Sequence, residues 1–287
     1  MLSLKVLTPI EFVQDLTNPL LSFLPKALIV TVACSLIAGF IGTYVVLRGM
    51  AFIGDAVAHS VFPGLAIAFV LQGSLILGGV AAGLATAVLV TVFSQNRRLK
   101  EDSVIGILFV SAFALGIVVL SRAPGYSGSL QSFLFGSITG ISDSDVTGVL
   151  VAALVIFVVA LAFNKELIAV SLDRESAKAS RLPVFWLDLL LYSLVTMVVV
   201  IAVQSVGNIL VLALLVTPAS TARLLTDRIG VMMSLAPLIG ALSAIVGSYL
   251  SWAVDLPAGG SIVLTSTAIF LITWVLAPKH GLLAKTA

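Results

Sequence analysis

Residues 26–47 of this chain read KALIVTVACSLIAGFIGTYVVL, an almost unbroken apolar run. A helix of about 20 apolar residues is long enough to cross the hydrocarbon core of a membrane, which is about 30 Å thick. Comparable runs recur along the rest of the chain, over residues 53–71, 74–94, 103–121, 147–163, 185–203, 206–223, 232–253 and 261–277. The sequence therefore predicts an all-α polytopic membrane protein with about eight to nine transmembrane helices.

The composition excludes a soluble fold. Only 10% of the residues are charged, against roughly 25% in an ordinary soluble domain, and the mean hydropathy is +1.22. In water such a chain would expose large apolar patches. A soluble enzyme, a nucleic-acid-binding protein and a disordered chain are excluded on this ground. The single cysteine, Cys34, excludes an intrachain disulfide framework.

The sequence divides into three parts. Residues 1–25 form an N-terminal segment in which Glu11 and Asp15 lie among apolar residues, a pattern that favours a short external helix at the membrane interface. Residues 26–277 form a single transmembrane domain, and residues 278–287 form a cytoplasmic tail.

The lysine and arginine residues predict the orientation of the chain, because cytoplasmic loops of membrane proteins are enriched in them. With nine alternating spans and a cytoplasmic C-terminus, all but three of the 15 cations lie inside, and the exceptions are Lys5, Lys26 and Arg122. We therefore expect an external N-terminus and a cytoplasmic C-terminus.

Asp55 and His59 are ionisable residues inside the apolar run at 53–71. An ionised side chain at the centre of a membrane helix costs at least about 2.5 kcal/mol, so such residues are functional candidates. Their i, i+4 spacing places both on one helix face, where a carboxylate and an imidazole form half a site for Mn²⁺, Fe²⁺ or Zn²⁺. Two copies around a two-fold axis would complete the ligand set, which predicts a homodimer. Pro63, which follows closely, favours a break in the same helix.

Other interpretations of the buried charges remain open at this point. The Asp55–His59 pair could be a hydrogen-bonded contact that only joins two helices. Asp188 lies near the start of the run at 185–203, after Pro183, and its position is typical of a structural acid at a helix N-terminus or at the interface.

The longest cytoplasmic loop, residues 165–184, contains a candidate docking segment. Asp173 or Ser171 can cap a helix there, Lys178 and Arg181 lie towards its end, and Pro183 stops it. The pattern predicts a short helix parallel to the membrane that faces a cytoplasmic partner, and an ordinary solvated connector is the alternative. The dipeptide Gly-Lys does not occur in the chain, so the chain has no P-loop and is not itself a P-loop ATPase.

Taken together, these features resemble the permease subunit of the bacterial ABC importers for manganese, zinc and iron. The block that carries the resemblance most specifically is LRGMAFIGDAVAHSVFPG, residues 47–64. Further matching blocks are EDSVIGI at 101–107, FALGI at 113–117, FLFG at 133–136, DRESAKA at 173–179, QSVG at 204–207, LLVTPASTAR at 214–223 and PAGGSIV at 257–263.

The resemblance implies a type II ABC importer fold in a bacterial plasma membrane. It implies a homodimer of permeases, two cytoplasmic ATPase subunits that hydrolyse ATP, and an external metal-binding protein that delivers the ion. It places Asp55 and His59 on the metal path and implies no catalytic residue, no permanently bound cofactor and no nucleic-acid partner in this chain. The residues that it assigns to ATPase coupling are Asp173, Arg174, Glu175, Ala177, Lys178, Arg181 and Leu182.

The transported ion that we expect is Mn²⁺, because residues 48–50, 262–267 and 276–281 look closer to the manganese branch of the family. Zn²⁺ and Fe²⁺ are the alternatives, since an Asp and His set does not separate these ions. A secondary metal transporter driven by ions is a rival from a nearby class. A membrane enzyme with Asp55 as its acid or base is a more distant rival, which the lack of a second nearby acid or nucleophile disfavours.

Overall fold

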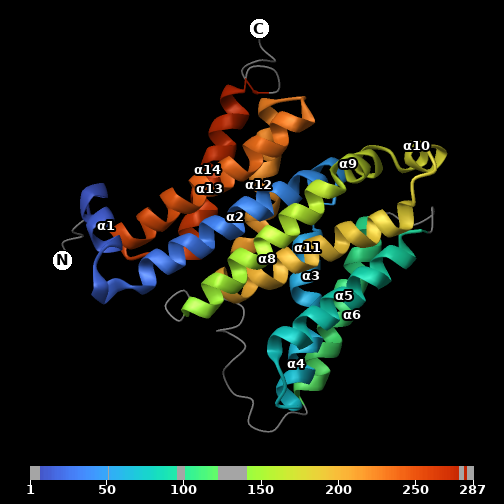
Figure 1. Cartoon of the computed structure of the whole chain (residues 1–287), viewed down its shortest axis with the longest axis horizontal. Coiled ribbons are helices and arrows are strands. Elements are labelled where there is room, and N and C mark those ends of the chain that lie inside the picture. The colour runs from blue at the N-terminus through green and yellow to red at the C-terminus, as the bar shows by residue number, and fades with distance from the viewer. Residues whose placement is uncertain (1–6, 51, 96–100, 122–140, 278–280, 283–287) are drawn as a thin grey trace.

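The structure is a computed structural model that describes residues 7–50, 52–95, 101–121, 141–277 and 281–282 (Figure 1). Within these ranges the chain is helical and has no strand, which confirms the predicted all-α class. The helices are α1 (Pro9–Leu16), the 3-10 helix η1 (Pro19–Leu21), α2 (Phe23–Arg48), α3 (Ile53–Ser60), α4 (Phe62–Val70), α5 (Leu75–Phe93), α6 (Glu101–Ser121), α8 (Asp143–Ala162), α9 (Asn164–Leu172), α10 (Arg174–Ala179), α11 (Val184–Val206), α12 (Asn208–Leu225), α13 (Ile229–Val254) and α14 (Ala258–Leu276).

The helices coincide with the nine predicted spans. Among the described residues, seven helical segments are long and apolar enough to cross a membrane, with α3 and α4 counted together. Shorter apolar segments in α5 and α12 supply the other two, over Leu77–Phe93 and Leu210–Leu225. The matching block at 133–136 lies outside the described residues, as do residues 278–280 and 283–287 of the predicted tail.

The second span is broken, as the proline in it predicts. Helix α3 ends at Ser60, and α4 begins at Phe62 with Pro63 in its first turn. Proline has no backbone N–H to donate, so it is well suited to the first turn of a helix and poorly suited to an interior. The break separates the half-span that carries Asp55 and His59 from the half-span that packs on α5.

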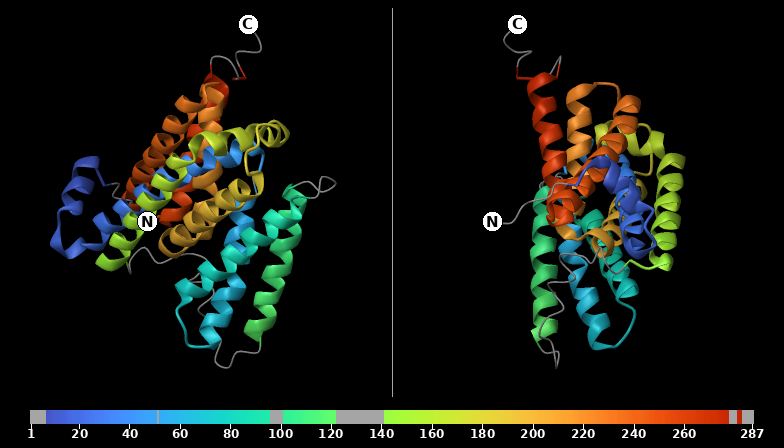
Figure 2. Two further views of the ribbon diagram at one scale, coloured as in Figure 1. Left: turned by 45° about the vertical axis from the view of Figure 1, so that its right-hand side comes forward. Right: turned by 90° about the vertical axis from the view of Figure 1, so that its left-hand side faces the viewer.

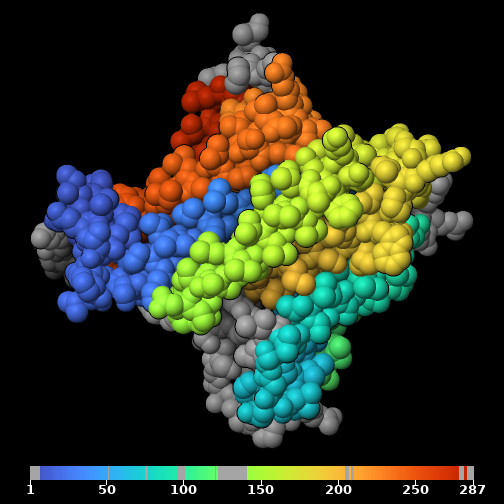
Figure 3. Space-filling model, in the orientation of Figure 1, coloured from blue at the N-terminus to red at the C-terminus, as the bar shows by residue number. Residues whose placement is uncertain are grey.

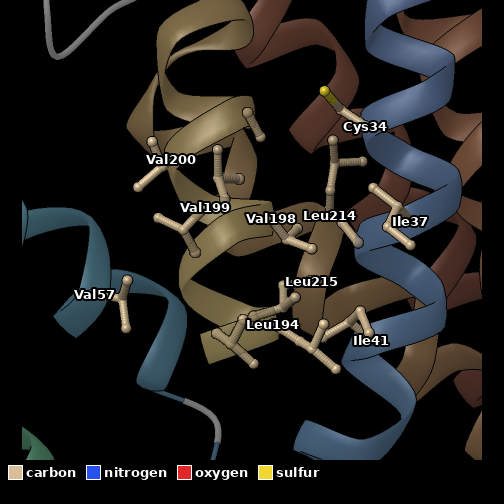
Figure 4. Close-up of a cluster of buried hydrophobic side chains, with 14 of the residues drawn as sticks. Cys34, Ile37, Ile41, Val57, Leu194, Val198, Val199, Val200, Leu214 and Leu215 are labelled. Carbon is tan, nitrogen blue, oxygen red and sulfur yellow. The ribbon is translucent and has the colours of Figure 1, made fainter. Parts of the chain in front are cut away.

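Helix α2 packs against α8, α11, α12 and α13. Helices α3 to α6 form a second group, and α11 joins this group to α2 through contacts with both (Figure 2). The buried core between them includes Ile37 and Ile41 of α2, Val198 of α11 and Leu214 of α12 (Figure 4). These side chains are fully or almost fully excluded from solvent, so the core holds α2, α11 and α12 together.

Helix α8 lies across the face of the molecule shown in Figure 3 and turns apolar side chains outward. The exposed residues of α8 include Leu150, Val151, Leu154, Val155 and Val158. Such a helix is suited to lipid, because its outer side chains are apolar and its backbone hydrogen bonds are satisfied within the helix.

The N-terminal helix α1 packs on the end of α13. A capping box between Thr8 and Glu11 begins α1. The Trp252 indole donates a hydrogen bond to the Asp15 carboxylate at 2.8 Å, and the ring of Phe12 packs edge-on against Tyr249. A short helix therefore exists in the N-terminal segment, and its external position remains a prediction.

Candidate functional site

The chain reverses direction immediately before the Asp55–His59 pair. Helix α2 ends at Arg48, and Gly49 then adopts a left-handed conformation with a φ of 75°. Glycine reaches this region without the steric cost that a Cβ atom imposes, so it is the usual residue at such a helix end. A short turn that includes the buried Met50 leads into α3 at Ile53.

Asp55 and His59 lie together on α3. The His59 Nδ1 atom lies 3.3 Å from the Asp55 Oδ1 atom and 3.0 Å from the Asp55 backbone oxygen. The side chains are 38% and 22% exposed, so both reach the surface of this chain. A neutral imidazole that donates its Nδ1 proton to the backbone oxygen presents the Nε2 lone pair that a metal ion requires.

Two aromatic rings of α6 flank the imidazole. The ring centroids of Phe109 and Phe113 lie 5.1 Å and 5.3 Å from that of His59, and both contacts are edge-on. Phe113 also contacts Phe62 at the start of α4. The His59 imidazole therefore packs against an aromatic face of α6.

These phenylalanines were not among the predicted site residues. Phe109 and Phe113 are four residues apart, so they share one face of α6, and Phe113 begins one of the matching blocks. That spacing was the available signal, but it is equally typical of ordinary helix packing.

The ligand set that one chain supplies is incomplete. Among the described residues, no group of three or more His, Cys, Asp or Glu side chains could hold a metal ion. Asp55 and His59 together offer one carboxylate and one imidazole, whereas a bound Zn²⁺ ion takes about four ligands and Mn²⁺ about six. Any site built on this pair needs ligands from another source.

The predicted docking helix is present as α10, which follows α9 directly. Asp173 caps α10 and accepts hydrogen bonds from the Glu175 backbone N–H at 3.0 Å and from the Ser176 hydroxyl. These hydrogen bonds, led by that from Ser176, lower the pKa of Asp173 below its ordinary value. The short capped helix that the pattern predicts is therefore present, and its docking to a cytoplasmic partner stays a prediction.

The seven residues predicted for ATPase coupling fall into three groups. Four of them are exposed, namely Asp173, Glu175, Lys178 and Arg181. Ala177 is buried against Val170, Val184 and Leu187, and Leu182 packs on the same cluster. Arg174 points inward, where it meets the charges described next.

Four charged residues from four helices form a closed set of ion pairs, which we call the ionic ring: Arg48, Glu101, Arg174 and Asp188. Arg48 donates to both Glu101 oxygens, at 2.8 Å and 2.7 Å, and its Nη1 atom lies 2.7 Å from the Asp188 Oδ1 atom. Arg174 donates to Glu101 and to Asp188, which closes the ring. A cavity of about 410 Å³ adjoins the ring, and its lining includes Arg48, Glu101, Asp102, Ser171 and Arg174.

The position of Asp188 corrects one interpretation of the sequence. Asp188 does not lie in the first turn of α11 and does not reach the interface, because it is fully buried in the ionic ring. Its structural role is therefore that of an ion-pair partner. The partners come from α2 and α10, and no local pattern in the sequence connects them.

The described residues form a helical protein whose apolar helices are long enough to span a membrane, and the Asp55–His59 pair lies on a broken one of these helices. The chain matches the ABC 3 transport family over residues 21–277 and belongs to that family. It is thus a membrane-embedded permease subunit, and the membrane-enzyme interpretation is set aside. The secondary-transporter interpretation is also disfavoured, because the family is one of ABC transporters.

Known relatives cover almost the whole chain. It is 40% identical to the manganese transport system membrane protein MntC of Halalkalibacterium halodurans, over 92% of this chain and 90% of that protein. It is also 40% identical to the chelated iron transport system membrane protein YfeC of Yersinia pestis, over 92% and 89% of the two chains. A solved structure of PsaBC from Streptococcus pneumoniae in complex with Fab is similar with a TM-score of 0.84 and 36% identity, over 98% of this chain and 100% of that one.

Proposed function

We propose that this protein is the permease subunit of an ATP-driven importer for a divalent transition-metal ion, with Mn²⁺ as the expected ion, in a bacterial plasma membrane. The observation that carries the proposal is the Asp55–His59 pair, held at 3.3 Å on a broken transmembrane helix. Relatives named for manganese support Mn²⁺, while the relative named for chelated iron keeps Fe²⁺ as an alternative alongside Zn²⁺.

A second copy of the chain completes the site in this proposal. Both side chains of the pair are partly exposed, so a two-fold axis near α3 brings two carboxylates and two imidazoles to one ion. These groups replace part of the hydration shell that the ion loses inside the membrane. The two chains rock about this site and open it to each side in turn, as in other alternating-access transporters.

The cytoplasmic ATPase docks on the exposed face of α10, and an external metal-binding protein delivers the ion. This arrangement requires the N-terminus outside and the C-terminus inside, as the cation distribution predicts. Lys178 and Arg181 on the exposed face supply charges that a partner surface can meet.

The direct test replaces each candidate ligand with an uncharged polar side chain of similar size. Asp55→Asn and His59→Gln variants are reconstituted with the ATPase in liposomes, and ATP-dependent uptake of Mn²⁺, Fe²⁺ and Zn²⁺ is measured. We expect uptake to fall to background in both variants while the ATPase still co-purifies. Asp227→Asn, at an exposed acid between α12 and α13, is the matched control and should transport normally. Normal uptake by both site variants would show that the metal path lies elsewhere.

The same liposomes decide the energy source and the ion. Uptake that proceeds without ATP and follows an ion gradient would favour a secondary transporter. Competition between the three ions, with each in excess over Mn²⁺, then ranks the substrates directly.

A further inference from the structure

We propose that the ionic ring is the mechanical link that carries movement of α10 to the helices holding Asp55 and His59. This inference rests on the transport function proposed above and adds to it a set of positioning residues, Arg48, Glu101, Arg174 and Asp188. In this role Arg174 does not contact the ATPase. It transmits the displacement of α10 to α6 and α2.

The contacts of α10 show where such a displacement can go. Helix α10 packs on α9 and α11 through the small apolar cluster around Ala177. Arg174, the first residue of α10, reaches past this cluster to Glu101 and Asp188, and its Nη1 atom also lies 3.4 Å from the backbone oxygen of Ser94 at the end of α5. One side chain therefore joins α10 to α5, α6 and α11.

From the ionic ring, one connection to the Asp55–His59 pair runs along α6. Glu101 is the first residue of α6, and Phe109 and Phe113 of the same helix contact the His59 ring. Glu101 and Phe109 are about 12 Å apart along the helix axis, since each residue adds about 1.5 Å. A shift of the start of α6 therefore moves the aromatic face against which His59 lies.

A second connection runs through the chain itself. Arg48 is the last residue of α2, and the short turn through Gly49 and the buried Met50 leads directly to the helix that carries Asp55. Arg48 is also fixed from the side, because its guanidinium lies 5.2 Å from the centre of the Tyr192 ring. The ionic ring thus adjoins both α6 and the turn that leads into α3, the two elements that hold the Asp55–His59 pair.

Because its central residues are buried, the members of the ionic ring move together. Arg48 is 4% exposed and Asp188 is fully buried, so both depend on their ion-pair partners in place of water. If Arg174 moved alone, it would leave the buried Asp188 carboxylate without one of its two arginine partners, which is strongly unfavourable. The partners therefore follow Arg174, and the adjoining cavity of about 410 Å³ offers space on one side for this movement.

A purely structural role for the ring is the competing explanation, and a neutral double variant separates the two. Arg174→Gln alone leaves the ring with an unbalanced acid, whereas Glu101→Gln/Arg174→Gln leaves Arg48 paired with Asp188 and restores charge balance. Each is reconstituted with the ATPase in liposomes, and thermal stability, ATPase co-purification, ATP hydrolysis and Mn²⁺ uptake are measured. Arg223→Gln, at an exposed position near the end of α12, is the matched control for the loss of one arginine charge.

We expect the double variant to keep near-normal stability, to bind the ATPase and to hydrolyse ATP, while Mn²⁺ uptake per ATP falls by at least about tenfold, the range of a typical coupling between sites. A stable double variant that imports Mn²⁺ at the wild-type ratio would overturn the inference and leave the ring a folding element. The result is separate from the proposed function, because ATP-dependent metal uptake by the wild-type complex and by the Asp55 and His59 variants tests that proposal independently.

Discussion

Arg48 and Asp188 form an ion pair of 2.7 Å in which neither side chain is appreciably exposed to solvent. The two residues come from the end of α2 and the beginning of α11, far apart in the sequence. Four of the few charged residues in this chain thus meet in one largely buried set. The consequences for stability and transport can be measured separately.

Removal of one member of this pair should destabilise the protein strongly. Arg48→Ala leaves Asp188 buried and short of its partner, a change that typically costs about 3–5 kcal/mol. Thermal unfolding in detergent measures the loss. Lys26→Ala is the control, because Lys26 pairs with Asp143 at 2.8 Å where the acid is almost fully exposed, and such pairs contribute at most about 1 kcal/mol. Equal effects of the two substitutions would contradict the assignment of a buried ring.

The cap of α10 should depend on pH in a defined direction. Hydrogen bonds lower the pKa of Asp173 below its ordinary value of about 4, so its carboxylate stabilises folded α10 above that pH. This contribution is lost as the pH falls through the lowered value. Hydrogen-exchange protection of the Glu175 and Ser176 amides should therefore drop in strong acid but remain constant near neutral pH. The Asp173→Asn variant keeps a capping oxygen that does not titrate, so a drop of the same size in that variant would refute the explanation.

Close contact between α2 and α12 should make Gly42 intolerant of a side chain. A Cβ atom at Gly42 would lie 1.8 Å from the backbone oxygen of Leu215, so the two helices would have to separate. Overpacking of this kind typically costs about 1–3 kcal/mol, and Gly42→Ala should lower the unfolding temperature. At Gly148 on α8 a Cβ atom would meet nothing within 4 Å. Gly148→Ala should therefore leave stability unchanged or raise it by up to about 1 kcal/mol.

The aromatic face of α6 should matter for transport more than for folding. Phe113→Leu keeps an apolar side chain but removes the ring that lies 5.3 Å from His59. With the imidazole less firmly oriented, we expect Mn²⁺ uptake to fall roughly tenfold, as is usual when the support of a metal ligand is weakened. Phe93→Leu, at an exposed position on α5, serves as the control in the same uptake assay. If both variants transport equally well, the phenylalanine does not position His59.

Several features of the molecule could be predicted from the chain because they depend on interactions that are local in sequence. The spans follow from apolar runs long enough to cross a membrane, and the break in the second span follows from Pro63. The pairing of Asp55 with His59 follows from their i, i+4 spacing on one helix. The cap at Asp173 likewise involves only its immediate neighbours.

Other features depended on tertiary structure, because they bring together residues that the sequence keeps apart. Phe109 and Phe113 reach His59 only because α6 packs along α3. Arg174 belongs to the segment expected to face a cytoplasmic partner, yet it turns inward to charges on α6 and α11. Helix packing decides which basic residue meets a buried acid. The spacing of residues along the chain does not predict it. Membrane physics thus sets the helices and the local Asp55–His59 pair, while packing decides which charges meet in the ionic ring beside α10.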